Sequence, residues 1–276
     1  MTAVLTGRGA DVRADVREHL HAEVRAALAT VVDPELDEPI TDVGFVRSVA
    51  VLEAGSAAGS GAAVEVHLRL PTSFCSPNFA WLMASDAQEA VAAVPGVERV
   101  VVELDDHHDS DLINRGLAAG VGYRGTFGSE AEDSLDELRA TFRRKAHLAA
   151  VDRAVTALLR ADPTLEDVHG LTLGDLPAAE ATTEGLLRRR AALGLPVGPD
   201  APVLVEHDGR RPDREHAALW LRRARSVRVS VDGNAHFCRG LLTTRYPGSK
   251  ADQVPRTDDD GRDRPLLPLA VSKGHR

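Results

Sequence analysis

The chain has 276 residues, of which 43% are hydrophobic, so it is long enough to bury the cores of two ordinary domains. Its formal net charge of -9 and its aromatic content of 4% argue against a nucleic-acid partner. A negative chain does not attract phosphates, and few aromatic rings are present to stack on bases. No apolar run reaches the roughly 18 to 20 residues of a membrane span, so we expect no membrane association.

The N-terminal hundred residues are predicted to form helix, strand, strand, helix and strand in that order. Residues 1–15 are small and polar and are expected to be a flexible N-terminus. Apolar residues then recur at helical spacing over residues 16–32, and a strand is predicted over residues 40–51. The small-residue run at 53–63 is expected to be a flexible hairpin tip.

A strand-helix-strand unit between Val64 and Asp111 organises this half of the chain. Apolar residues alternate from Val64 to Leu70, which predicts a half-buried strand. A helix is expected to start just beyond Cys75, and a second strand to follow it at residues 97–104. Cys75 is therefore predicted to lie in the loop that leads into the helix, where the positive end of the helix dipole favours a thiolate.

The C-terminal half is predicted to be mainly helical with a small sheet. Helices are expected at residues 112–121, 135–159, 184–193 and 215–225, and short strands at 203–205 and 227–231. The fold class is therefore α+β, with a small N-terminal α/β sandwich and a mainly helical C-terminal domain. The predicted divisions are the flexible segment 1–15, an N-terminal domain at 16–105, a C-terminal domain at 106–249 and a disordered tail at 250–276.

Four stretches of the N-terminal half form a pattern: the D-P-E turn at residues 33–35, the ITDVGFV stretch at residues 40–46, the VHLRLPTSFCSPN loop that contains Cys75 and the VPGVERVVVEL stretch at residues 94–104. Together they resemble the MIP18 family domain. The resemblance covers about residues 16–105, and it departs from the family pattern at Ser76, where the family has proline after the cysteine. It implies a role in iron-sulfur cluster assembly or in the maturation of metal-dependent oxygenases.

Within that resemblance, Cys75 is the primary candidate as a transient ligand of iron or an iron-sulfur cluster. An exposed thiolate suits such cargo, whereas a small buried hydrophobe is the commonest fate of a free cysteine. Asp33 and Glu35 are further candidate ligands if their loop converges with that of Cys75. The alternative is that Asp33 caps a turn and Glu35 is solvated.

Two more groups of side chains are candidate metal ligands. His107, His108 and Asp109 follow the second strand of the unit, and imidazole with carboxylate suits iron or zinc. The alternative is an acidic turn in which Asp109 caps the next helix. His236 and Cys238 would complete a mixed nitrogen and sulfur site with the loop thiol, unless Cys238 is a core residue and His236 a surface one.

We therefore predict a cytoplasmic maturation factor that is not an enzyme. With Cys75 and Cys238 as its two cysteines, the chain has no disulfide framework, as expected in a reducing compartment. The C-terminal extension resembles proteins linked to bacterial gene clusters for soluble di-iron monooxygenases, which implies a client metalloprotein such as a component of that system. Homo-oligomerisation stays open.

The rival hypothesis is a metal-free adaptor that docks the client oxygenase component through a basic cluster. The residues of that cluster are Arg222, Arg223, Arg225, Arg228 and Arg239. A third class, a thiol-dependent hydrolase, would require a histidine and a carboxylate that orient Cys75, and no motif indicates them.

Overall fold

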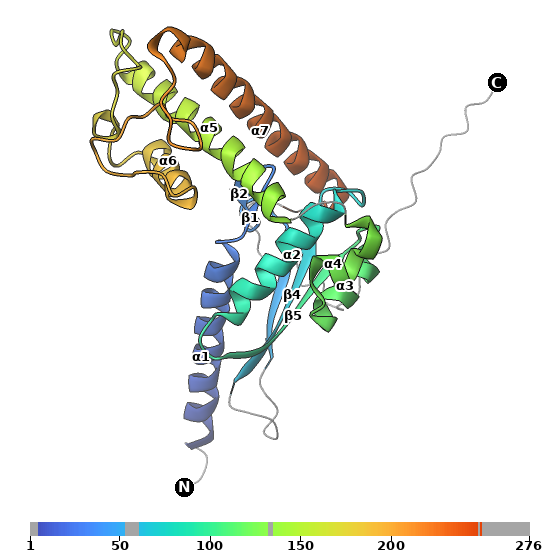
Figure 1. Cartoon of the computed structure of the whole chain (residues 1–276). Coiled ribbons are helices and arrows are strands. Elements are labelled where there is room, and N and C mark those ends of the chain that lie inside the picture. The colour runs from blue at the N-terminus through green and yellow to red at the C-terminus, as the bar shows by residue number, and fades with distance from the viewer. Residues whose placement is uncertain (1–4, 53–60, 132–134, 248, 250–276) are drawn as a thin grey trace, which may run out of the picture.

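The computed structural model of the protein describes residues 5–52, 61–131, 135–247 and 249 (Figure 1). The tail predicted at 250–276 and most of the predicted hairpin tip, residues 53–60, lie outside these ranges. The first helix starts at Leu5, so the chain becomes helical well before the predicted start at residue 16.

The predicted order of the N-terminal elements is confirmed, with a short two-stranded ribbon added after the first helix. The elements are α1 (Leu5–Leu28), β1 (Val32–Asp33), β2 (Glu38–Pro39), β3 (Val46–Leu52), β4 (Ala62–Arg69), α2 (Pro77–Ala92) and β5 (Val97–Asp105). The remaining helices are α3 (Ser110–Ala119), α4 (Gly122–Phe127), α5 (Leu135–Ala161), α6 (Ala181–Ala192) and α7 (Ala217–Arg245). Short 3-10 turns occupy Gly128–Glu130, Leu173–Asp175 and Arg214–His216. The fold class is α+β, as predicted.

The N-terminal sheet has the order β3-β4-β5, with β4 in the centre. Strands β3 and β4 pair antiparallel, whereas β4 and β5 pair parallel, and α2 makes the crossover between them. This is the predicted strand-helix-strand unit. Because the two strands are parallel, the loops that leave their C-terminal ends come out at the same edge of the sheet.

Strand β3 starts at Val46, later than the predicted residue 40. Gly44 has a φ of 81°, a left-handed conformation that interrupts an extended strand and that glycine adopts at little cost. Residues 40–45 consequently form a tight turn, in which the amide of Phe45 donates to the carbonyl of Ile40 at 2.9 Å. The Gly44 carbonyl in turn accepts from Nε of Arg69 at 3.2 Å.

The first core lies between the sheet and the helices α1 and α2. Alternate residues of the strands are buried on that side, and helical spacing buries one face of each helix. Representative members are Val24, Leu28, Val64, Val66, Leu68, Ala84, Val91, Val102 and Leu104. Helix α3 joins this core through Ile113 and Leu117, and the end of α7 joins it through Ala235 and Leu242. The predicted domain boundary at residue 105 stays a prediction.

A second core lies among α5, α6 and the first half of α7. It includes Val151, Val155, Leu186, Leu204, Trp220 and Ala224. Helices α5 and α7 lie side by side and run in opposite directions, so that α7 returns from the second core to the first (Figure 1).

Two predicted C-terminal strands are wrong. Residues 227–231 lie inside α7, and residues 203–205 are irregular, beside an isolated bridge between Thr172 and Pro202. Within the described part of the chain, both sheets belong to residues 32–105, so the small C-terminal sheet is also wrong. The buried residues of α7 recur at helical spacing, because the helix packs along its length against α5 and then against the first core.

Candidate functional site

Three chain segments converge around Cys75. They are the loop after β4, the loop after β5 and the C-terminal end of α7. Arg245 of α7 joins them, because its guanidinium donates to the Leu70 carbonyl at 3.0 Å, to Ser73 Oγ at 2.9 Å and to the Asp106 carbonyl. The parallel pairing of β4 and β5 places the two loops at one edge, and α7 closes over that edge.

Cys75 itself is partly buried, in the loop that precedes α2, as predicted. The helix begins at Pro77, which is favourable at the first helical position because its missing N–H has no intrahelical acceptor there. The Cys75 Sγ lies 3.5 Å from Oγ1 of Thr72, a residue that sequence reasoning did not single out. Thr72 also accepts from the amide of Phe74 at 3.2 Å, so it fixes the turn that presents the thiol.

Asp33 is the last residue of β1, and Glu35 lies in the loop that joins β1 to β2. Asp33 is only 6% exposed, and its Oδ1 accepts from the amides of Glu35 and Leu36 at 2.8 Å each, so it does cap the turn. Burial raises the pKa of Asp33 to about 6, although these two hydrogen bonds act in the opposite direction. Glu35 is not simply solvated, because its Oε1 accepts from Nδ2 of Asn234 on α7 at 3.2 Å.

Cys238 extends this group from α7. It is partly buried and packs against the first core. Burial raises the pKa of the Cys238 thiol to about 11, and the neighbouring groups Asp33, Cys75 and Glu35 raise it further. The β1-β2 loop, the Cys75 loop and α7 therefore bring two thiols and two carboxylates into one electrostatic neighbourhood. The sequence predicted all four residues but not the helix that delivers Cys238.

His236 does not join Cys238. The two residues were predicted to flank a turn, but both lie inside α7, where positions two apart point to different sides. His236 is exposed, whereas Cys238 faces the core. This geometry gives no support to the predicted His-x-Cys ligand pair, which stays a prediction.

His107 holds the Cys75 loop in place. It is buried, its Nε2 donates to the Cys75 carbonyl at 2.8 Å, and its Nδ1 accepts from the Asp109 amide at 3.1 Å. Both ring nitrogens are thus engaged, and a metal ion would have to replace one of these hydrogen bonds. The backbone amide of His108 donates to the Ser73 carbonyl at 2.9 Å, and its exposed ring lies 5.7 Å from that of Phe74.

Asp109 occupies the position before α3 without a side-chain cap, although its carbonyl accepts the first helical hydrogen bond from Ile113. The predicted ligands do not gather into one cluster. Among the residues that the structure describes, the side chains whose potential ligand atoms lie within 4.8 Å of one another in a group of three are Glu65, His67 and Glu103, on the sheet.

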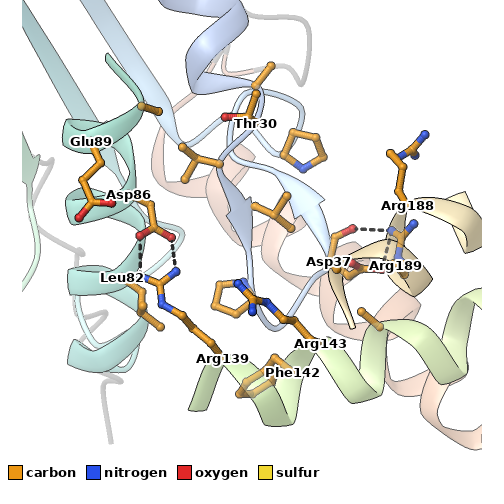
Figure 2. A pocket seen from close by; sticks show the side chains of 18 residues that line it. Thr30, Asp37, Leu82, Asp86, Glu89, Arg139, Phe142, Arg143, Arg188 and Arg189 are labelled. Atoms are coloured by element: carbon orange, nitrogen blue, oxygen red, sulfur yellow. Dashed lines mark hydrogen bonds and ion pairs between the residues drawn. The ribbon is translucent and has the colours of Figure 1, made fainter. Parts of the chain in front are cut away.

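A cleft of about 920 Å³ lies where the two cores meet, bordered by the β1-β2 ribbon, α2, α5 and α6 (Figure 2). Ion pairs line its walls. Arg139 of α5 donates to both carboxylate oxygens of Asp86 on α2 at 2.6 and 2.5 Å, and Arg189 of α6 lies 2.6 Å from Asp37. None of the predicted ligands lines this cleft. The ion pairs on its walls connect the two halves of the chain.

Some members of the basic cluster predicted for docking form ion pairs within the chain, whereas Arg222, Arg223 and Arg225 are exposed. Arg228 lies 2.5 Å and Arg225 3.6 Å from Asp152 of α5, and Arg239 pairs with Glu38. In the described part of the chain, no helix combines the length and the apolar character that crossing a lipid bilayer requires.

Comparison with known proteins points to one family. The family model described as iron-sulfur cluster assembly protein matches residues 21–104, which confirms the resemblance predicted for residues 16–105. An iron-sulfur cluster carrier protein of Mycobacterium tuberculosis (strain H37Rv) is 36% identical over 86 residues, which are 31% of this chain and 20% of that protein. The corresponding protein of Mycobacterium leprae is 34% identical over 86 residues, with the same coverage.

An uncharacterized protein of Methanocaldococcus jannaschii is 34% identical over 95 residues, which are 34% of this chain and 90% of that protein. The chain thus spans only 20% of the length of the mycobacterial carrier proteins but most of the archaeal one. No solved structure matches the chain. The family match ends before α3, so the helical C-terminal region, including Cys238, lies outside it.

Proposed function

We propose that this chain, which belongs to the iron-sulfur cluster assembly protein family through residues 21–104, binds iron or an iron-sulfur cluster transiently and passes it to a client metalloprotein. The ligand that carries the proposal is Cys75. The observation that supports it most strongly is the position of this partly buried thiol at the start of α2, within the matched region and among the segments that converge there.

The surroundings of Cys75 suit a soft cationic cargo. Thiolates are preferred ligands of iron in clusters, and nearby carboxylates add negative charge that favours a bound cation. Asp33 and Glu35 supply that charge, and Cys238 offers a second sulfur from α7. A site with few protein ligands, at the edge of the sheet and partly open, favours transfer over permanent retention.

The role of such a protein is delivery and not catalysis, and we place it in the cytoplasm. A component of a metal-dependent oxygenase, such as a di-iron monooxygenase system, is the client that we propose. The C-terminal helices would serve this purpose by recognising the client, since they lie outside the family match and surround the cleft between the cores.

Anaerobic reconstitution tests the proposal. The full-length protein, incubated with ferrous iron, sulfide and a thiol reductant and then desalted, should retain iron with the visible absorption of a thiolate-ligated cluster. Cys75→Ser should lose most of the bound iron, because an alcohol is a poor ligand for it. Cys238→Ser should retain part of it, and His236→Ala, on the exposed side of the same helix, should behave like the unmodified protein.

Equal iron retention in the unmodified protein and in Cys75→Ser would reject the proposal, because Cys75 would then not be the ligand. The metal-free adaptor requires instead that neither protein retains iron and that the client still binds Cys75→Ser. The contacts restrict that alternative only in part. Arg228 and Arg239 form ion pairs within the chain, whereas Arg222, Arg223 and Arg225 are exposed.

A further inference from the structure

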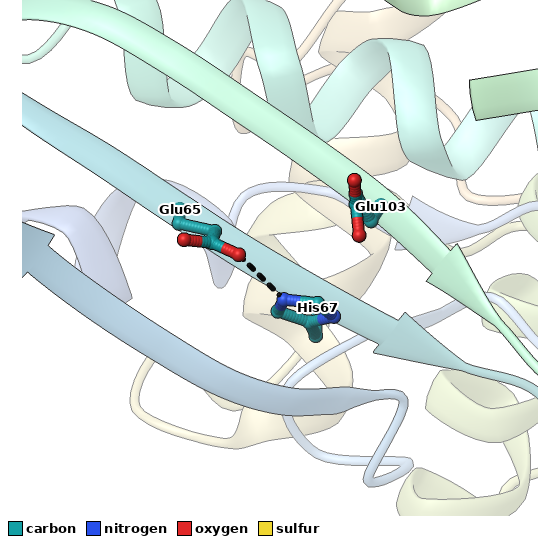
Figure 3. A group of neighbouring side chains, drawn as sticks. All are labelled: Glu65, His67 and Glu103. Carbon is teal, nitrogen blue, oxygen red and sulfur yellow. Dashed lines mark hydrogen bonds and ion pairs between the residues drawn. The ribbon is translucent and has the colours of Figure 1, made fainter. Parts of the chain in front are cut away.

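The outward face of the N-terminal sheet carries a second group of potential ligands. Glu65 and His67 are two residues apart on β4, so their side chains leave the same side of the strand. Glu103 of β5 is the register partner of His67, which places it on the same face. Figure 3 shows the three side chains gathered over the two neighbouring strands. Their inward neighbours Val66 and Val102 are buried in the first core.

The three residues have the spacing of an ion site. One potential ligand atom from each lies within 4.8 Å of the other two. His67 Nε2 donates to Glu65 Oε1 at 2.9 Å, and a bound ion would have to replace the proton of this hydrogen bond. A tetrahedral zinc ion with bonds of about 2.0 to 2.2 Å holds its ligand atoms about 3.5 Å apart. Binding of an ion would therefore require the three ligand atoms to approach from within 4.8 Å of one another to about that spacing.

The carboxylate of Asp105 orients the imidazole of His67 through the ring nitrogen that faces away from Glu65. His67 Nδ1 donates to Oδ1 of Asp105 at 2.9 Å, and the other oxygen of Asp105 accepts from Arg47 of β3 at 2.8 Å. Metal-binding histidines commonly donate their second ring nitrogen to a carboxylate in this way, because it fixes the ring and makes the ligating nitrogen more basic. Strands β3, β4 and β5 each contribute one member to this His67-Asp105-Arg47 chain.

We propose that Glu65, His67 and Glu103 bind a divalent transition-metal ion of zinc type at a site distinct from Cys75. Two carboxylate oxygens and one imidazole nitrogen suit such an ion, and three protein ligands leave a coordination position for water or for an exchanging ligand. Asp105 is a positioning residue, since it acts through His67 and not on the ion. No residue of this site belongs to the thiol and carboxylate group around Cys75.

The test uses the full-length chain with Cys75→Ser and Cys238→Ser, so that neither thiol binds the probe and the outcome is independent of the proposed cluster role. Calorimetric titration with Zn²⁺, and absorption spectroscopy with Co²⁺, should show one bound ion. Glu103→Gln and His67→Gln should each abolish that binding. Asp105→Asn should weaken it by about 10- to 100-fold while keeping one ion per chain.

His216→Gln is the matched control, because His216 is exposed on the C-terminal half and also lies beside two carboxylates, those of Asp213 and Glu215. It should leave the affinity unchanged. Circular dichroism checks that each variant is folded. The proposal is overturned if the thiol-free chain binds no Zn²⁺ or Co²⁺, or if Glu103→Gln, folded, binds either ion as tightly as the thiol-free parent.

Discussion

Individual residues around Cys75 divide into those that would hold cargo and those that hold the loop. Cys75, Cys238 and the carboxylates belong to the first kind. His107 belongs to the second, because it is buried and its two ring nitrogens bond the Cys75 carbonyl and the Asp109 amide. Sequence alone predicts that a histidine near a cysteine is a ligand, but it does not reveal that a backbone carbonyl has already engaged the ring.

His67 offers a residue-scale prediction for the metal-free protein. Its hydrogen bond with Asp105 raises the pKa of the imidazole to about 9; burial opposes this, and the hydrogen bond with Glu65 adds to it. In an NMR titration with a chelator present, His67 should therefore lose its proton near pH 9. Asp105→Asn should shift that midpoint down towards the ordinary value of 6.5.

The raised pKa of His67 determines how the free energy of unfolding changes with pH. The charged His67 stabilises the fold fully below its unfolded pKa, and that contribution is lost as the pH rises through the folded value of about 9. The unmodified protein should consequently lose more unfolding free energy between about pH 6 and about pH 10 than Asp105→Asn does. An unchanged His67 midpoint in Asp105→Asn would show that this carboxylate is not the cause.

At the scale of elements, α7 does most to shape the site. Sequence reasoning predicted a helix over residues 215–225 and a strand over residues 227–231, because valines alternate in the second stretch. The structure has a single helix there, in which Val231 is buried and Val229 is 56% exposed. A short alternation of three valines also fits a helix, and contacts with α5 and the first core decide between the two.

Leu242 gives the element-scale prediction. It is 3% exposed and joins the end of α7 to the first core, so Leu242→Ala should leave a cavity and lower the unfolding free energy by about 2 to 5 kcal/mol. Leu219→Ala is the control on the same helix, since Leu219 is 60% exposed, and it should change stability by no more than about 0.5 kcal/mol. Urea denaturation measures both; equal effects would contradict the packing of α7 described above.

Much of the Cys75 site could be predicted from the sequence, whereas the metal site on the sheet could not. The D-P-E turn and the loop cysteine lie in a continuous pattern of strands, turns and helix that local chemistry determines. Glu103, by contrast, meets His67 only through the register of two parallel strands, which a crossover helix of sixteen residues separates along the chain. No local signal fixes that register.

On the scale of the whole molecule, the chain has two cores and α7 runs from one to the other. Ion pairs reinforce the junction: Asp37 of the ribbon pairs with Arg189 of α6, and Asp86 of α2 pairs with Arg139 of α5. The C-terminal helices α5, α6 and α7 therefore directly contact the region that matches the family. Because α7 carries Cys238, any movement of this helix would alter the ligand set that we propose around Cys75.

Cluster transfer tests the central claim most directly. The reconstituted full-length protein, desalted under anaerobic conditions, is mixed with an apo-ferredoxin as acceptor, and the acceptor's circular dichroism is followed over time. We predict that the unmodified protein transfers its cluster, that Cys238→Ser transfers with a changed rate, and that Cys75→Ser transfers almost none. Transfer by Cys75→Ser with the same yield and rate as the unmodified protein would contradict the account.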